Sequence, residues 1–535
     1  MTSEEIKNEI VAGKTILGIE FGSTRIKAVL INSKNEVIAQ GSFDWENSLV
    51  DGVWTYSLDE VNCGLRETYA CLKKNVLQKY DAKLTKFFSI GISGMMHGYL
   101  AFDKNGNLLV PFRTWRNTMT REASAKLSSL FNYPVPERWS ISHLYQAILK
   151  NETHISSLAF LTTLSGYVHW KLTGQKVLGI GDASGMFPID AREKNYNQKM
   201  LCQFSDLVST KNFLWNSESV LPKVLVAGEK AGVLTKEGAL LLDKDGELEE
   251  GVPFCPPEGD AGTGMVATNS VAKRTGNISA GTSVFAMLVL EKELSKMYPR
   301  QIDLVATPSG LPVAMSHANN CTGDYDAWIQ VLGKAAEVLG AKFSKAQLYD
   351  TLLGEALKGD DDCAGLLPYN YISGESMTAL DEGRAIFVRS PNAHFTLANF
   401  MRSHLFTALC AMRCGMDILF EKENVQCDAL VCHGGFFKTR EVGLKIMAAA
   451  MHTKTIAMET AGEGGAWGIA LLASYMMNGQ KRRLEEFLRE DVFTENEVTI
   501  IEPNEKDVAG FNIFYERYMN GLPIVKTATE CTYQN

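Results

Sequence analysis

The segment GIEFGSTRIKAVLI (residues 18–31) places one glycine and two hydroxyl residues between two apolar runs. Apolar residues before Gly22 and after Thr24 predict two strands joined by a tight turn. Glycine allows a close approach of the backbone to a ligand, and the amides and hydroxyls of Ser23 and Thr24 can surround an anion such as phosphate. A plain hairpin turn has the same composition, so this segment alone leaves both interpretations open.

The same pattern returns about half a chain later, in RTGNISAGTSVFAMLVLE (residues 274–291). Gly281, Thr282 and Ser283 occupy the place of the first turn, and an apolar run follows them. A pattern repeated once at this distance indicates two related halves and excludes a short-period solenoid. The sequence therefore predicts an α/β protein of two halves, with a ligand cleft between them.

The surrounding pattern supports this α/β class. Three short apolar runs within residues 15–43 predict a strand meander, and residues 57–80 have helical spacing. A small-residue helix is expected to begin near Asp260 after a Pro/Gly loop. Later, a strand, a Gly-Gly turn and a helix are expected over residues 428–452. The tail beyond Asp491 is charged and less patterned, so we expect it to be peripheral.

Composition and charge narrow the possible partners. The formal net charge of the 535 residues is −9, with no Lys/Arg-rich run, which argues against nucleic acid and anionic membranes and favours a small molecule or a protein. The 11 cysteines include no C-x-x-C pair, so reduced thiols of a cytoplasmic protein fit best. The N-terminal residues are acidic, and no apolar run is long enough to span a membrane. An apolar helix face can serve as core or as the interface of a homodimer, and the sequence leaves both open.

Two common nucleotide motifs are disfavoured. The segment NEIVAGKT has Asn8 where a P-loop needs glycine, and it precedes the first predicted strand instead of following one. The segment GEGGAWG does not have the G-x-G-x-x-G spacing of dinucleotide-binding folds.

Five elements remain: the two Gly-hydroxyl hairpins, the turn GMMHG, the lone acid of PEGDAGTG, and a late Gly-Gly loop before a helix. Their order and spacing over residues 15–505 resemble the FGGY family of carbohydrate kinases, and within it the ketopentose kinases that act on xylulose or ribulose. The resemblance implies the two-domain actin/hexokinase-like (ribonuclease H-like) ATPase fold. It places an N-terminal domain at residues 15–272 and a C-terminal domain at residues 273–510.

The resemblance also assigns roles at the phosphates. It implies two phosphate-binding turns, formed by Gly22, Ser23, Thr24, Gly281, Thr282 and Ser283. ATP and Mg²⁺ are the implied cofactors, and the acid before the first turn is expected to approach the metal through water. This acid is Glu20, where family members usually have the shorter aspartate, so the geometry around the metal is open.

Asp260 matches the catalytic aspartate of the family. A carboxylate there would accept the proton of the attacking hydroxyl and orient its oxygen toward the γ-phosphorus. From residue type and position alone, a helix N-cap is the alternative. The next residue is Ala261, where xylulokinases usually have an asparagine, and this difference leaves the identity of the sugar open.

The sugar is expected to contact Met96 and His97 of the GMMHG turn and Trp115 of the segment RTWRNT. A lone histidine is more often structural, and Trp115 could equally belong to the core. The segment differs from the usual Trp-Asn-Asp of the family, because Arg116 stands between Trp115 and Asn117.

The adenosine is expected to lie on a loop containing Gly434 and Gly435, where glycine lets the backbone pass close to the base. Phe436 and Phe437 follow where relatives often have small residues, so they either reshape the nucleotide pocket or belong to the core. The later glycine-rich helix start at residues 464–466 is interpreted equally well as nucleotide contact or as close helix packing.

The implied activity is the ATP-dependent phosphorylation of the terminal hydroxyl of D-xylulose or L-ribulose in pentose catabolism. Two alternatives remain open at this point. One is a kinase for a polyol such as glycerol or ribitol, which would differ in a few pocket residues. The other is a nucleotide-switch protein on the same superfold, because a fold does not determine a function.

Overall fold

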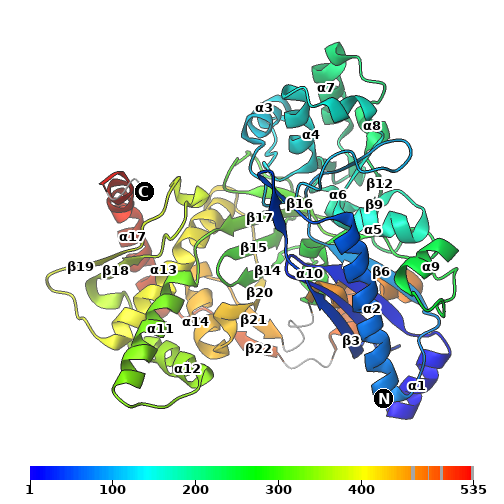
Figure 1. Ribbon diagram of the computed structural model, residues 1–535. Coiled ribbons are helices and arrows are strands. Elements are labelled where there is room, and N and C mark those ends of the chain that lie inside the picture. Colours follow the sequence, from blue (N-terminus) through cyan, green and yellow to red (C-terminus); the bar gives the residue numbers. More distant parts are fainter. Residues whose placement is uncertain (459–463, 480, 495–497, 532–535) are drawn as a thin grey trace. The chain divides into compact units, whose positions relative to one another are not determined.

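Figure 1 shows the computed structural model of the protein, which describes residues 1–458, 464–479, 481–494 and 498–531. The chain forms two compact units. The first contains Met1–Val271, Leu304–Val313 and the described residues from 464 to 494. The second contains Ala272–Asp303 and the described residues of 314–458 and 498–531. A single division of the chain near residue 272 was expected from the sequence, whereas two later segments pack with the first unit.

The first unit is built on a five-stranded sheet with the order β13-β6-β1-β2-β3. Strands β1, β2 and β3 are the predicted meander, paired antiparallel, while β6 is parallel to β1 and β13 is parallel to β6. The strands are β1 (Ile16–Phe21), β2 (Arg25–Ile31), β3 (Val37–Asp44), β6 (Ser89–Gly94) and β13 (Glu258–Gly259).

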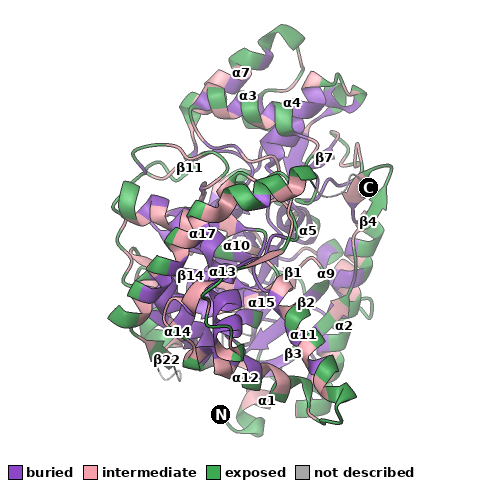
Figure 2. Ribbon diagram, turned by 90° about the vertical axis from the view of Figure 1, so that its left-hand side faces the viewer, coloured by how far each residue is buried: buried purple, intermediate pink, exposed green. Residues whose placement is uncertain are grey.

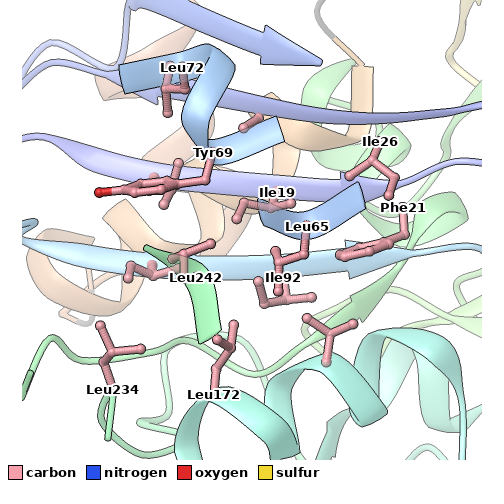
Figure 3. Packing of buried hydrophobic residues seen from close by; sticks show 14 of the residues in the cluster. Ile19, Phe21, Ile26, Leu65, Tyr69, Leu72, Ile92, Leu172, Leu234 and Leu242 are labelled. Carbon is pink, nitrogen blue, oxygen red and sulfur yellow. The ribbon is translucent and has the colours of Figure 1, made fainter. Parts of the chain in front are cut away.

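The alternation of residues along β1 separates a structural face of this sheet from a polar one. Ile19 and Phe21 join the apolar cluster beneath α2 (Leu58–Tyr80), which also contains Leu65 and Tyr69 (Figure 3). Helix α2 starts at a capping box of Ser57 and Glu60 and shows both buried and exposed residues along its length (Figure 2).

The opposite face of β1 carries Gly18 and Glu20, and α15 (Gly464–Ser474) packs against it. A Cβ on Gly18 would lie 2.1 Å from the carbonyl oxygen of Ala466, so only glycine allows the helix to approach this closely. The segment 464–466 is therefore a site of close helix packing, as one of its two interpretations proposed. Residues 459–463, which precede it in the glycine-rich segment, lie outside the described residues.

The remaining elements of the first unit surround this sheet and a second apolar cluster that contains Trp139. Its further helices are α1 (Ser3–Val11), α3 (Arg121–Phe131), α4 (Ser140–Leu149), α5 (Leu164–Thr173), α6 (Ile180–Ala183), α7 (Gln198–Val208), α8 (Ser217–Val220), α9 (Lys236–Leu242), α10 (Asp260–Ala267) and α16 (Leu484–Phe487). Short strand pairs are β4 (Ser48–Val50) with β5 (Val53–Thr55), β7 (Leu100–Phe102) with β8 (Phe160–Thr162), β9 (Val177–Gly179) with β12 (Lys223–Leu225), and β10 (Ile189–Asp190) with β11 (Asn195–Tyr196).

The second sheet repeats the motif of the first. Strand β14 (Thr275–Ala280) pairs antiparallel with β15 (Val284–Val289) and parallel with β20 (Ala429–His433), as β1 pairs with β2 and β6. The full order is β16-β17-β15-β14-β20-β21-β22, with β16 (Asp303–Ala306), β17 (Pro312–Ala318), β21 (Thr455–Met458) and β22 (Val498–Ile501). The repeated strand, turn and strand predicted from the sequence is thus confirmed.

The elements of the second unit that lie outside this sheet are mainly helical. They are α11 (Gly323–Val338), α12 (Lys345–Glu355), α13 (Leu397–Asp417), α14 (Arg440–Met451) and α17 (Glu505–Cys531), with the strand pair β18 (Leu366–Tyr369) and β19 (Ile386–Arg389). Helix α13 is buried along most of its length and continues into a π-helical turn (Ile418–Lys422). None of the helices in the described part of the chain is long and apolar enough to cross a membrane.

The expectation of a peripheral C-terminal tail is wrong. Strand β22 pairs with β21, and α17 buries Phe511, Phe514 and Tyr518 in the second unit. The hydroxyl of Tyr369 donates to the carbonyl oxygen of Tyr518 at 2.9 Å. The apolar residues of α17 recur at helical spacing but are separated by charged residues, which obscured the pattern in the sequence.

Candidate functional site

Glu20 lies at the end of β1, on the sheet face covered by α15. Its carboxylate accepts a hydrogen bond from the amide of Ala466 at 3.2 Å, near the start of that helix. A Cβ on Gly465 would lie 2.3 Å from Glu20 Oε1, so glycine makes room for the acid. Burial and the nearby Asp260 carboxylate raise the pKa of Glu20 to about 7. Glu20 and Asp260 therefore lie close enough to repel each other when both are ionised.

Asp260 is the first residue of α10, directly after β13. Its Oδ1 accepts from its neighbouring amide, Ala261 N, at 3.0 Å and from Met96 N at 3.3 Å. The N-cap position belongs to Gly259, so the predicted alternative of a capping side chain does not describe Asp260. Burial raises the pKa of Asp260 to about 6, which leaves it mainly ionised at neutral pH. Such a carboxylate can accept a proton.

The turn that contains Met96 and His97 follows β6 and contacts Asp260 through the Met96 amide. His97 has a φ of 70°, and its Nδ1 lies 3.2 Å from the carbonyl oxygen of Gly185. Burial, followed by the charge of Arg138, lowers the pKa of His97 to about 3. A neutral imidazole that donates from Nδ1 to this carbonyl has Nε2 as a hydrogen-bond acceptor.

Trp115 is 41% exposed, so it is not a core residue. Its indole Nε1 donates to the hydroxyl oxygen of Ser23 at 3.3 Å. This bond joins a residue predicted to contact the sugar to the first turn predicted to bind phosphate. Asn117 instead has a structural role, because its side chain bonds both the amide and the carbonyl of Trp54, at 2.9 and 2.8 Å.

Two aromatic residues hold the backbone of the turn of residues 22–24, and no pattern in the sequence had indicated them. Trp45 donates from its indole to the carbonyl oxygen of Gly22 at 2.8 Å, and the Tyr56 hydroxyl donates to that of Ser23 at 2.6 Å. Both residues lie in the irregular region around β4 and β5, where no periodicity in the sequence indicates which turn they contact.

A second pair of residues, which the sequence analysis did not single out, supports the segment around Asp260. Asp182 and Glu258 are almost completely buried, and Glu258 accepts from the amides of Gly181 and Asp182 at 3.2 and 2.9 Å. Asp182 accepts from the Thr163 hydroxyl at 2.7 Å. Burial, followed by the Asp182 charge, raises the pKa of Glu258 to about 8. Burial likewise raises the pKa of Asp182 to about 7.

The glycines of the segment GIGDASG (residues 179–185) were a signal for this pair in the sequence. A Cβ on Gly179 or Gly181 would lie 2.2 or 2.4 Å from a carboxylate oxygen of Glu258. The segment therefore wraps around a carboxyl group, but the sequence alone did not indicate which one.

In the second unit, the residues Gly281, Thr282 and Ser283 form the turn between β14 and β15. The Gly281 amide donates to the Ser283 carbonyl at 2.8 Å, and the Cys321 amide donates to that of Thr282 at 2.9 Å. These bonds give the turn a defined shape.

The loop with Gly434 and Gly435 lies against the end of β14, directly before this turn. Gly434 has a φ of 102°, and a Cβ there would lie 2.4 Å from the carbonyl oxygen of Ala280. Only glycine fits, both for this conformation and for this approach. Phe436 and Phe437 are buried, with ring centroids 5.2 Å apart. They therefore belong to the core, which was one of the two interpretations of these residues.

Models of known protein families match most of the chain. The model of the N-terminal domain of the FGGY family of carbohydrate kinases matches residues 15–267, and that of the C-terminal domain matches residues 276–477. A xylulose kinase of Haemophilus influenzae is 23% identical over 529 residues, which cover 95% of this chain and 99% of the relative.

Solved structures show the same fold. A ligand-bound xylulose kinase from Lactobacillus acidophilus superposes with a TM-score of 0.77 at 17% identity, covering 97% of this chain and 99% of that one. A gluconate kinase from the same organism has a TM-score of 0.78, with the same identity and coverage. The predicted two-domain α/β fold of the actin/hexokinase-like sugar kinases is confirmed.

Proposed function

The chain belongs to the FGGY family of carbohydrate kinases and is a sugar kinase. From this premise we propose that it transfers the γ-phosphoryl group of ATP to the terminal hydroxyl of a ketopentose. The xylulose kinases among its relatives favour D-xylulose as the acceptor, with L-ribulose as the alternative. A polyol such as glycerol or ribitol is the second candidate class.

The observation that carries the proposal is the contact between Asp260 and the turn of Met96 and His97. Asp260 is the base: its carboxylate accepts the proton of the terminal hydroxyl and orients the oxygen. The new bond joins this oxygen to the γ-phosphorus, the bond from the γ-phosphorus to the bridging oxygen breaks, and ADP leaves. The neutral His97 accepts a hydrogen bond from a sugar hydroxyl through Nε2, while Met96 and Trp115 provide apolar surface.

The two acids Glu20 and Asp260 fit a nearby divalent cation. Glu20 and Asp260 raise the local negative charge, and a cation near them would lower the cost of keeping both ionised. Among the residues that the structure describes, no three Asp, Glu, His or Cys side chains form a metal-ligand group, so phosphate and water would supply most ligands of a Mg²⁺ approached by Glu20. The metal would spread the negative charge that develops during transfer.

In the same proposal, the backbone amides and hydroxyls of two turns hold the phosphates, and a glycine loop holds the adenosine. The phosphate residues are Gly22, Ser23, Thr24, Gly281, Thr282 and Ser283, and the adenosine residues are Gly434 and Gly435. The sugar site and the base then belong to an N-terminal domain of residues 15–272, and the adenosine loop to a C-terminal domain of residues 273–510.

The test measures ADP release from Mg-ATP with D-xylulose, L-ribulose, D-ribulose, L-xylulose, ribitol, glycerol and gluconate. The wild type and Asp260→Asn are compared, and nucleotide binding is measured for both. We expect one ketopentose to stimulate the wild type and the variant to lose this stimulation, by a factor of about 10²–10⁴, while still binding ATP. If no compound stimulates ADP release, the kinase proposal fails in favour of a nucleotide switch; an active Asp260→Asn would remove Asp260 as the base.

A further inference from the structure

Three aromatic side chains from separate segments donate hydrogen bonds to the turn of residues 22–24. Trp45 bonds the carbonyl oxygen of Gly22, Tyr56 bonds the carbonyl oxygen of Ser23, and Trp115 bonds the hydroxyl oxygen of Ser23. Two of the bonds therefore act on the backbone of the turn, and one acts on the side chain proposed to touch phosphate.

The two backbone anchors are buried and packed against each other. Trp45 and Tyr56 are 7% and 1% exposed, and their rings stack with centroids 4.1 Å apart. The Trp45 amide also donates to the carbonyl oxygen of Thr24 at 3.1 Å. This buried pair holds the backbone of the turn by three hydrogen bonds, whereas Trp115 has a large exposed fraction that a ligand can reach.

The direction of the Trp115 bond has a chemical consequence. An indole N–H is a donor only, so Ser23 Oγ is the acceptor. The single proton of the Ser23 hydroxyl is then available for another acceptor, such as a phosphate oxygen. A hydroxyl that accepts one hydrogen bond becomes a better donor in the next, because bonds in a chain polarise one another.

The main chain around Trp115 is fastened to the β4–β5 hairpin. The guanidinium of Arg116 lies 4.0 Å from the centroid of the Trp54 ring and donates to Asn47 Oδ1 at 2.9 Å. Asn117 bonds the Trp54 backbone. Arg116, which departs from the family pattern, and Asn117 thus anchor the segment, while the Trp115 ring itself stays accessible.

We propose that Trp115 is a positioning residue that couples the acceptor site to phosphate binding at Ser23. A sugar that lies against the exposed indole holds the ring in place, so that Nε1–H stays on Ser23 Oγ and the Ser23 proton points to a phosphate oxygen. Without the sugar, the exposed ring is free to move, and the hydroxyl loses its orientation. This inference rests on the proposed kinase function and adds a cause for acceptor-dependent nucleotide binding.

The test uses Trp115→Phe, which keeps an aromatic ring but removes the donor, together with Ser23→Ala and the double variant. Trp215→Phe is the matched control, because this half-buried indole of the same unit donates to the carbonyl oxygen of Ile155 at 2.8 Å, away from the turn. Calorimetry measures the affinity for Mg-bound β,γ-imido-ATP with and without the acceptor that the substrate panel identifies. Steady-state kinetics give kcat and KM.

We expect the acceptor to tighten binding of the analogue to the wild type and to Trp215→Phe. Trp115→Phe should lose most of this enhancement and about tenfold in kcat, and the double variant should lose no more than the worse single variant. A wild type that no compound stimulates would refute the kinase function itself. If the wild type is stimulated, three results overturn only the coupling: no tightening by the acceptor, a Trp115→Phe that keeps it, or additive losses in the double variant.

Discussion

At the scale of single residues, the site combines groups whose protonation is shifted in opposite directions. Burial raises the pKa of Asp260 to about 6 and lowers that of His97 to about 3. Around neutral pH the acid is mainly a carboxylate and the histidine is neutral, so one group can take a proton and the other can accept a hydrogen bond.

The pH dependence of the reaction should report Asp260. Because the base must be ionised, we expect kcat/KM for the acceptor to fall as the pH drops below about 6, measured between pH 5 and 8.5 with saturating Mg-ATP. A profile that stays flat down to pH 5 would contradict the assignment.

Stability should change in the opposite sense. An acid with a raised pKa in the folded state favours folding at low pH, and this contribution is lost as the pH rises through about 6. Asp260→Asn, which cannot ionise, should therefore be more stable than the wild type at pH 8, by about 1 kcal/mol after solvent screening is allowed for. Thermal unfolding at pH 5 and pH 8 measures this, and a variant less stable at pH 8 would refute it.

The role of His97 can be tested by a substitution that keeps its structural bond. Asparagine tolerates the positive φ, and its side-chain amide can replace Nδ1–H toward Gly185, but it has no counterpart of Nε2. His97→Asn should raise the KM for the acceptor about tenfold, the value of one hydrogen bond, with an unchanged melting temperature. An unchanged KM would show that His97 is structural only.

At the scale of elements, the site depends on how closely α15 approaches β1. Gly18 and Gly465 create this approach, and the Ala466 amide then reaches Glu20. A side chain at Gly18 would push the helix away from the strand and weaken the position of the acid.

Gly18→Ala should therefore destabilise the protein by about 1–3 kcal/mol and reduce activity. Gly354→Ala in α12 is the matched control, since a Cβ at Gly354 would meet no packed neighbour within 4 Å, and alanine favours a helix. Thermal unfolding of both variants measures the difference. Equal melting temperatures would mean that α15 can move without cost.

At the scale of the whole molecule, each unit recruits segments that are distant in sequence. Residues 304–313 and the described residues from 464 to 494 complete the first unit, and α17 completes the second. Helix α17 is thus part of the core of the second unit, so removing its buried side chains should lower the stability of the protein.

Tyr518→Ala should lower the free energy of unfolding by about 3–5 kcal/mol, because it leaves a cavity beside Tyr369 and Tyr371. Lys526→Ala, on the exposed side of the same helix, should have almost no effect. Differential scanning calorimetry compares the two, and equal transitions would restore the peripheral tail that the sequence indicated.

Local patterns were enough to predict the α/β class and several of its elements, whereas the candidate site residues came from the resemblance to the family. The duplicated hairpin, the meander and the helix at Asp260 follow from apolar periodicity and turn residues, which act over a few neighbours. The order of the motifs then indicated the family. Contacts between segments that lie far apart in the sequence leave no such local trace.

Three sets of contacts were therefore visible only in the folded chain: the aromatic anchors with the first turn, Glu258 with the segment around Asp182, and α15 with Glu20. The exposed position of Trp115 and its bond to Ser23 were likewise visible only in the structure, because the sequence allowed both a core residue and a sugar contact there. Periodicity in a sequence describes which residues share a face, but only tertiary packing selects the partner that a face meets, because that choice depends on shape and on hydrogen bonds between distant segments.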